Sequence, residues 1–291
     1  MGDVLFAIQR APIQTPVAPY ALADGLLQFS DQPLSLTGGV VEQFEQVGQD
    51  EAHEAQLSAM LALCRVRPLW WRKENSCEIP PMLVVHHLND SRSQRILWLL
   101  EELGAPYEIK HYARDANTRL APPELKAVHP LGKSPVITDG DVTIAESGAI
   151  VDYIVRTYGK GRLGPPAGAK TAEQYNEWLH YAEGSAMLPL MLNMYVGRLG
   201  EAGAPLHPRI QDEMANHLSY VNGALAGRDW LMGPDITGAD IQMSFVGEVA
   251  RAFGQMETYP NIKGWVERFQ ARPAYQASLE KGGAYNLGPA R

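Results

Sequence analysis

The stretch that decides the fold is LVVHHLNDSRSQRILWLLEELG, residues 83–104. It opens with an apolar run that is typical of a buried strand and that stops at a polar turn. A leucine-rich helical repeat follows at once and ends at Gly104, a residue type common at helix C-termini. The hydroxyls of Ser91 and Ser93 therefore stand where a strand is followed by a helix N-terminus, a position that favours anions. A thiolate is such an anion, and its pKa falls at such sites.

The overall composition excludes several classes of protein. The chain has 291 residues, enough for one large or two ordinary domains, and a formal net charge of −8. Lysine and arginine do not cluster with aromatic residues, so nucleic acid is not an expected partner. No apolar run approaches the roughly 18 residues of a membrane span. Because the N-terminal residues fit neither a secretory signal nor a transit peptide, we expect a cytoplasmic protein with no membrane contact.

The positions of the cysteines limit the chemistry further. The chain has two, Cys64 and Cys77, and none follows from Met82 onward. The main body therefore has no disulfide, no thiolate metal site and no cysteine nucleophile, which argues against a cysteine-based thiol transferase. A Cys64–Cys77 disulfide is not expected in a reducing compartment. Since the eight histidines show no ligand spacing, we expect no metal site.

Composition divides the chain into an extension and two domains. Residues 1–81 are interrupted by prolines and lack a convincing periodic pattern, so we interpret them as a poorly ordered N-terminal extension. A regulatory or targeting arm is the alternative. Residues 82–159 alternate strand and helix patterns, as an α/β domain does. The glycine- and proline-rich residues 160–170 are predicted to be a linker, and residues 171–285 an all-helical domain.

The α/β domain is predicted to contain a small mixed sheet flanked by helices. A crossover helix at 91–104 makes the strands at 83–87 and 107–112 parallel to each other. A hairpin pairs 135–138 with 142–145 around Asp139-Gly140, a dipeptide common in tight turns. Gly184 and Pro189 are expected to bend the longest helix. Further helices are predicted at 123–128, 147–158, 171–199, 207–226, 237–254, 262–272 and 275–281.

Four motifs, taken in order, are specific enough to indicate a family. They are SRSQRILWLLEELG at 91–104, HPLGKSPVI at 129–137, ESGAIVDYI at 146–154 and ITGADI at 236–241. With these motifs the chain from Met82 to about Gly282 resembles the cytosolic glutathione transferases, in particular the bacterial and fungal branch with a serine near the first helix. The resemblance implies a thioredoxin-like N-terminal domain that binds glutathione, an all-helical C-terminal domain and a homodimer. It also implies that Pro135 follows a cis peptide bond.

Ser91 is the candidate catalytic residue. By its position in the motif it matches the family's serine, whose hydroxyl donates a hydrogen bond to the sulfur of glutathione. The structural alternative is that Ser91 and Gln94 form a capping box at the start of the helix. Ser93 is the second candidate for the thiolate donor. Asp90 would oppose thiolate formation if it pointed inward, so we expect it to point outward.

Other residues match the family's grip on glutathione. Glu146 and Ser147 match the pair that holds the γ-glutamyl end, although an ordinary helix N-cap would read the same way. Lys133 is the candidate partner of the glycyl carboxylate, and it could equally be a solvated loop residue. Ser134, with its backbone groups next to Pro135, is expected to bind the peptide-like part of the ligand. Arg92 is a weaker candidate of the same kind.

Two further patterns concern the helical domain. Met187, Met191 and Met194 recur at helical spacing, which is typical of core packing. In the family the same long helix lines the pocket for the electrophile, and methionine surfaces adapt to varied apolar ligands.

Thr237 and Asp240 match the family's folding box, whose role is to cap a buried helix and not to take part in chemistry.

The sequence therefore predicts an enzyme that conjugates the thiol of glutathione to apolar, small-molecule electrophiles, by addition or displacement. Glutathione would be a co-substrate, and no metal is expected. One alternative is glutathione-dependent reduction of peroxides or disulfides. Another is a non-catalytic binding module that kept the fold and lost the chemistry.

Overall fold

The computed structural model describes residues 82–165, 168–283 and 285–288. The predicted extension at 1–81 and both cysteines lie outside the described residues. The described residues all belong to one compact unit, Ser76–Arg291. Within them, no helix has both the length and the apolar character needed to cross a membrane.

A four-stranded mixed sheet forms the first part of this unit, as the sequence predicts. Its strands are arranged in the order β2-β1-β3-β4. The central strand β1 pairs in parallel with β2 and antiparallel with β3, and β3 pairs antiparallel with β4. Gly140, with a φ of 58°, occupies the tight β3–β4 turn that its conformational freedom allows. The strands are Val84–Leu88 (β1), Glu108–Tyr112 (β2), Val136–Asp139 (β3) and Val142–Ala145 (β4).

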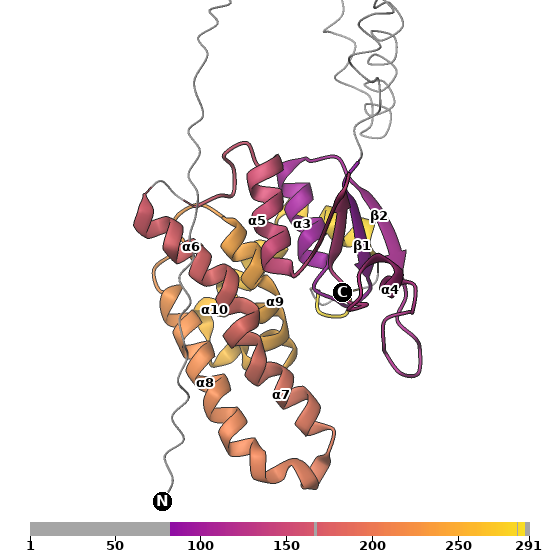
Figure 1. Ribbon diagram of the computed structural model, residues 1–291. Helices are drawn as coiled ribbons and strands as arrows, with labels where there is room; N and C mark the ends of the chain where they lie inside the picture. The colour runs from indigo at the N-terminus through magenta and orange to yellow at the C-terminus, as the bar shows by residue number, and fades with distance from the viewer. Residues whose placement is uncertain (1–81, 166–167, 284, 289–291) are drawn as a thin grey trace, which may run out of the picture. The chain divides into compact units, whose positions relative to one another are not determined.

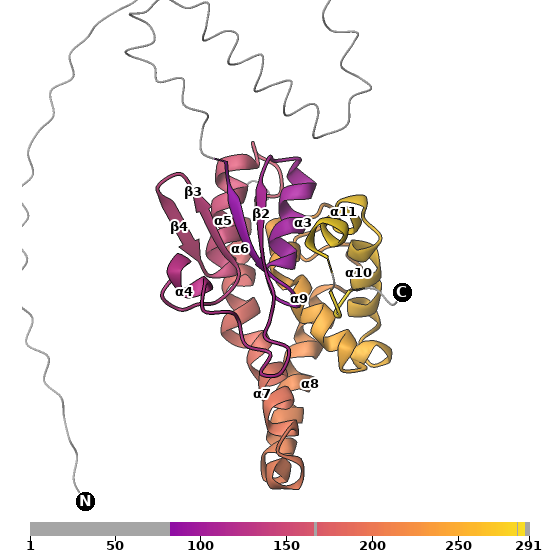
Figure 2. The same cartoon turned by 90° about the vertical axis from the view of Figure 1, so that its right-hand side faces the viewer.

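Helices lie on both faces of this sheet. Helices α3 (Gln94–Leu103) and α5 (Ser147–Tyr158) lie side by side on one face (Figures 1 and 2). The short α4 (Leu125–Val128) lies on the other, where Leu125 packs with Leu88 and Tyr112 in a separate small apolar cluster. This arrangement of a small mixed sheet between helices is the thioredoxin-like domain that the resemblance implies.

The predicted long helix at 171–199 is interrupted where Gly184 and Pro189 suggest a bend. It consists of α6 (Ala169–Tyr181), a π-helical turn η1 (Ala182–Ala186) and α7 (Met187–Gly197). Pro189 has no amide hydrogen for the carbonyl of Ser185 and its ring crowds that carbonyl, which explains why regular α-helical bonding fails in the preceding turn. The π turn directs Glu183 toward the N-terminal domain, where two arginines bind it.

The remaining helices complete the all-helical domain. Helix α9 lies in its centre and is buried along nearly all of its length. Helices α7 and α8 form an antiparallel pair that extends beyond the other helices (Figures 1 and 2). Helix α11 packs along α3, so the end of the chain returns to the first domain. The bounds are His207–Ala224 (α8), Gly238–Ala252 (α9), Pro260–Gln270 (α10) and Pro273–Gly282 (α11).

Of the two predicted capping boxes, one forms and one does not. At the start of α9 the side chain of Thr237 and that of Asp240 cap each other's backbone groups, as predicted. The predicted Ser91–Gln94 box is wrong, because α3 begins at Gln94 itself. The amide of Gln94 instead donates to Ser278 Oγ of α11 at 2.9 Å, so packing against the C-terminal helix decides its orientation.

Candidate active site

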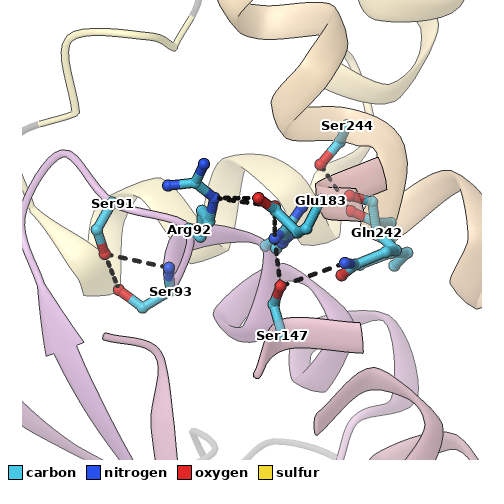
Figure 3. A network of polar contacts seen from close by, with 9 residues as sticks. Ser91, Arg92, Ser93, Ser147, Glu183, Gln242 and Ser244 are labelled. Atoms are coloured by element: carbon cyan, nitrogen blue, oxygen red, sulfur yellow. Dashed lines mark hydrogen bonds and ion pairs between the residues drawn. The ribbon is translucent and has the colours of Figure 1, made fainter. Parts of the chain in front are cut away.

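The turn between β1 and α3 holds the two serines that the sequence singles out. Ser91 is 5% exposed and Ser93 is fully buried. Ser91 Oγ accepts the backbone N–H of Ser93 at 3.2 Å and lies 2.8 Å from Ser93 Oγ (Figure 3). Both hydroxyls stand just before the N-terminus of α3, where an anion is stabilised.

Asp90 precedes Ser91, and its side chain is bound by residues far from it in the sequence. Its φ of 51° is unusual for a residue with a side chain. The carboxylate accepts two hydrogen bonds at 2.9 Å from the backbone and side chain of Asn286, and it pairs with Arg119 at 2.8 Å. Partial burial would raise the pKa of Asp90, but these hydrogen bonds outweigh it and hold the pKa below its usual value. The expected outward orientation is thus only partly met, since 12% of this side chain is exposed.

Ser147, the first residue of α5, is surrounded by hydrogen-bond donors. Its Oγ accepts from the guanidinium of Arg95 and from Nε2 of Gln242, at 3.2 Å in the latter case. Neither group can accept a hydrogen bond in return, so the hydroxyl proton of Ser147 remains available for another acceptor. Together with the first backbone amides of α5, this hydroxyl can bind a carboxylate.

Glu183 in the π turn connects the two domains through two arginines. Its carboxylate lies 2.5 Å from Arg95 and 2.8 Å from Arg92. Burial would raise the pKa of Glu183, but the two guanidinium groups outweigh it and keep the pKa below its usual value. The carboxylate therefore stays ionised, as the buried charge of Arg95 requires. Figure 3 shows Arg92 between the two serines of the turn and the Ser147 cluster.

A hollow brings the predicted binding residues together. It is lined by Arg92, Leu131, Lys133, Ser134, Pro135, Ala145, Glu146, Ser147 and Glu183. Lys133 and Glu146 are exposed, and within the described residues neither forms an ion pair. Ser91 is not among the lining residues, but its neighbour Arg92 is.

The conformation around the hollow places backbone groups at its wall. The peptide bond between Ser134 and Pro135 is cis, as the resemblance implies. Ser134 Oγ donates to the carbonyl of His86 at 2.8 Å, so this side chain is occupied and its backbone is the part left for a ligand. Glu146 has a φ of 68°, a backbone conformation that is uncommon for a residue with a side chain.

The methionines of the long helix differ in their burial. Met187 is 1% exposed and belongs to the core, so it cannot line a pocket. Met191 and Met194 are half-buried, and Met191 packs at the edge of the core. An exposed Tyr195 follows on α7.

Sequence reasoning missed three residues that hold the site. Arg95, Gln242 and Glu183 orient Ser147 from α3, α9 and the π turn. Arg95 does carry a signal, because a charged side chain inside an otherwise apolar helix needs a buried carboxylate as its partner. Nothing in the sequence shows that this partner is Glu183, 88 residues away. Across the described residues, no group of three or more histidine, cysteine, aspartate or glutamate side chains could hold a metal ion.

The fold defines a class: a thioredoxin-like domain joined to a helical domain, with a hollow lined by residues of both. Comparison with known families agrees, since "Glutathione S-transferase, N-terminal domain" matches residues 80–156 and "Glutathione S-transferase, C-terminal domain" matches residues 180–273. Glutathione S-transferase 1 of Saccharomyces cerevisiae is 36% identical over 224 residues, covering 69% of this chain and 95% of the yeast protein. Glutathione S-transferase 3 of Schizosaccharomyces pombe is 37% identical, covering 69% and 88%.

Solved structures give the same result. A glutathione S-transferase from Actinobacillus pleuropneumoniae is 34% identical, with a TM-score of 0.64, and the match covers 71% of this chain and 95% of that one. A family member from Pseudomonas fluorescens, solved with two glutathione bound, is 25% identical with a TM-score of 0.60, covering 72% and 97%. The chain therefore belongs to the cytosolic glutathione S-transferase family, and it is a glutathione transferase.

Proposed function

We propose that this enzyme conjugates the thiol of glutathione to apolar electrophiles, and that the hydroxyl of Ser91 hydrogen-bonds the sulfur and stabilises its thiolate. The observation that carries the proposal is the gathering of Lys133, Glu146 and Ser147 in one hollow beside the Ser91 turn. Glutathione has two carboxylates and one amine. Ser147 and Lys133 suit the carboxylates, and the free carboxylate of Glu146 suits the amine.

One hydrogen bond from Ser91 and the N-terminus of α3 can together supply the free energy needed to lower the pKa of the thiol. A free thiol has a pKa of about 8.5, so little thiolate exists at neutral pH. Lowering that pKa by two units corresponds to about 2.7 kcal/mol. A hydrogen bond to a charged group contributes about 1.5–3 kcal/mol, and the N-terminus of α3 adds roughly 0.3–1 kcal/mol.

An apolar second substrate is supported by the surroundings of the turn. Leu131 lines the hollow and is 59% exposed. Tyr195 is 53% exposed on α7. These two side chains offer apolar surface to which part of an electrophile could bind.

We also propose a homodimer and a cytoplasmic location. Exposed apolar side chains gather on the helical pair α7–α8 and the segment between them: Leu188, Leu192, Leu199, Leu206 and Tyr220 are each at least 41% exposed. A surface of this kind is typical of a protein interface, and a second copy of the chain would cover it. Light scattering after size exclusion tests the dimer, and fractionation of cells tests the location.

The experiment that tests the proposed function measures binding and turnover separately. Titration calorimetry with glutathione gives the affinity, and a panel of electrophiles that includes peroxides gives the reaction. We expect binding at micromolar to millimolar glutathione and conjugation of aromatic or unsaturated apolar electrophiles. Absence of binding at millimolar glutathione would instead favour the non-catalytic module, and turnover of peroxides alone would favour the reductase.

A further inference from the structure

The hydroxyl of Ser91 is the first member of a buried chain of polar contacts. Ser91 Oγ lies 2.8 Å from Ser93 Oγ, and Ser93 Oγ lies 2.8 Å from Nδ1 of His87. Nε2 of His87 lies 3.1 Å from the carbonyl oxygen of Gly282, at the end of α11. Ser93 and His87 are at most 2% exposed, so no water competes for these contacts.

The carbonyl of Gly282 determines which group donates and which accepts in each of these hydrogen bonds. A carbonyl oxygen only accepts, so Nε2 of neutral His87 carries the proton and Nδ1 is a bare acceptor. Two acceptors lie near Ser93 Oγ, namely Nδ1 of His87 at 2.8 Å and the carbonyl of Leu88 at 3.3 Å, and Ser93 donates its proton to the closer one, His87. Since Ser93 Oγ then only accepts from its neighbours, Ser91 donates its own proton to Ser93. At rest the free lone pair of Ser91 suits the proton of a neutral thiol.

Ionisation of a bound thiol would change the number of protons shared among these polar contacts. With a sulfur next to Ser91, this series of polar contacts has four donor–acceptor gaps, and each gap is a hydrogen bond only when one proton lies in it. The gaps are sulfur–Ser91, Ser91–Ser93, Ser93–His87 and His87–Gly282. The thiol, the two hydroxyls and neutral imidazole supply one proton for each gap. Loss of the thiol proton to water would leave one gap with two facing lone pairs in a buried place, which is costly. Transfer of that proton to His87 leaves every gap filled.

We propose that His87 receives the thiol proton through Ser93 and Ser91, so that the thiolate forms without releasing a proton to water. This inference rests on the proposed role of Ser91. The S–H bond breaks as a proton joins Ser91 Oγ, the Ser91 proton moves to Ser93 Oγ, and the Ser93 proton moves to His87 Nδ1. The electron pair stays on sulfur and attacks the electrophile. When the carbon–sulfur bond has formed, the proton leaves His87 by the same hydroxyls, to the product or to water.

The surroundings of His87 suit a base that must be neutral at rest. Its ring contacts Ser93, the Gly282 carbonyl and the edge of His111, whose ring centre is 5.7 Å away. Burial first, and the nearby His111 second, lower the pKa of His87 to about 4, against the opposing carbonyl. His87 is therefore neutral when the thiol binds. A thiolate at the Ser91 end of these contacts raises the pKa of His87, because the two opposite charges stabilise each other in buried surroundings. Once the negative sulfur is consumed this stabilisation is lost, and His87 gives up its extra proton. His87 and Ser93 act through Ser91, so they are positioning residues.

The test replaces His87 by asparagine, whose amide oxygen can accept from Ser93 but cannot take up a proton. Single-turnover rates with a slow electrophile should fall roughly hundredfold, with an unchanged Kd for glutathione. Ser93→Ala should cause a similar loss, and the double variant should be no slower than either. His86→Asn is the matched control, because the side chain of His86 is also buried on β1 but contacts Tyr112 and Thr138. Its rate should equal that of the wild type.

A second readout concerns the proton itself. Glutathione is mixed with the wild-type enzyme in weak buffer with a pH indicator, at a pH where the free thiol is neutral. No proton should be released on binding. One proton released per glutathione bound, or a His87→Asn enzyme as fast as the wild type, overturns the relay. If Ser91→Ala is also fully active, the proposed function of Ser91 fails as well, whereas a slow Ser91→Ala with a fast His87→Asn removes the relay alone.

Discussion

The guanidinium of Arg95 in α3 lies 2.5 Å from the carboxylate of Glu183 in the π turn η1 of the helical domain. Arg95 is 2% exposed in its side chain, and it also donates to Ser147, so one buried cation serves both the domain junction and the site. The geometry around Ser147, which we propose to bind glutathione, therefore depends on a contact between residues 88 apart in the chain.

Glu183→Gln should destabilise the fold and weaken glutathione binding. Loss of one partner of a buried pair leaves the other charge uncompensated, at about 3–5 kcal/mol. Glu183 keeps 27% of its side chain exposed, so we expect about 2–3 kcal/mol, measured by urea denaturation. The control is Glu213→Gln, which breaks a pair with the exposed Arg209 and a 3.7 Å contact with His217, and which should cost at most about 1 kcal/mol. Equal effects of the two substitutions would contradict the role of the buried pair.

Ser147→Ala removes the hydroxyl proton that we assign to the γ-glutamyl carboxylate. A hydrogen bond to a charged group contributes about 1.5–3 kcal/mol, so the Kd for glutathione should rise roughly tenfold to hundredfold. Calorimetry measures this change directly. Ser244→Ala is the matched control, because Ser244 is buried but bonds only the carbonyl of Ile241 in its own helix. An unchanged Kd for Ser147→Ala would remove Ser147 from the grip.

Asp240→Ala should cause a large loss of stability without direct chemical effect. Its buried carboxylate accepts from the backbone of Leu231 and Thr237 and from the indole of Trp265, at 2.8 to 3.2 Å. The substitution orphans all these donors, and we expect a cost of roughly 3–5 kcal/mol. Asp152→Ala, which breaks an exposed pair with Arg156, should change stability by less than about 1 kcal/mol. Similar denaturation midpoints for the two variants would be inconsistent with this account.

Acid should destabilise the protein through His87. The folded-state pKa of about 4 lies below the ordinary value of 6.5, so protonation favours the unfolded chain. The contribution of neutral His87 is fully present above pH 6.5 and is lost as pH falls toward 4, by up to about 3 kcal/mol. The free-energy difference between the wild type and His87→Asn should therefore shrink across this window. A constant difference from pH 7 to pH 4 would show that His87 does not titrate there.

Local patterns were enough to predict the sheet and most of the helices. Alternation and turn residues indicated β1 to β4, and the Thr237–Asp240 box was read correctly because its partners are three residues apart. The Ser91–Gln94 box has the same spacing and does not form, because Ser278 of α11 competes for Gln94. A short-range rule cannot anticipate a contact made 184 residues later.

The candidate site likewise contains residues that local motifs predict and residues that only long-range packing brings together. The local motifs on which the resemblance rests were enough to name Lys133, Ser134, Pro135, Glu146 and Ser147. The residues that orient them come from three distant elements: Arg95, Glu183 and Gln242. Their pairing depends on the π turn and on how the helical domain packs, which periodicity does not encode. The partner of His87, the Gly282 carbonyl, is a backbone atom and leaves no mark on the sequence.

The measurement that tests the central claim most directly compares kcat/KM of the wild type and Ser91→Ala from pH 6 to 9, with glutathione affinity measured alongside. Loss of the hydrogen bond to sulfur should slow conjugation at least tenfold near pH 6.5, as about 1.5–3 kcal/mol predicts. The gap should narrow toward pH 9, where the free thiol of pKa about 8.5 ionises without help. A Ser91→Ala enzyme that binds glutathione and matches the wild type across this range would contradict the account.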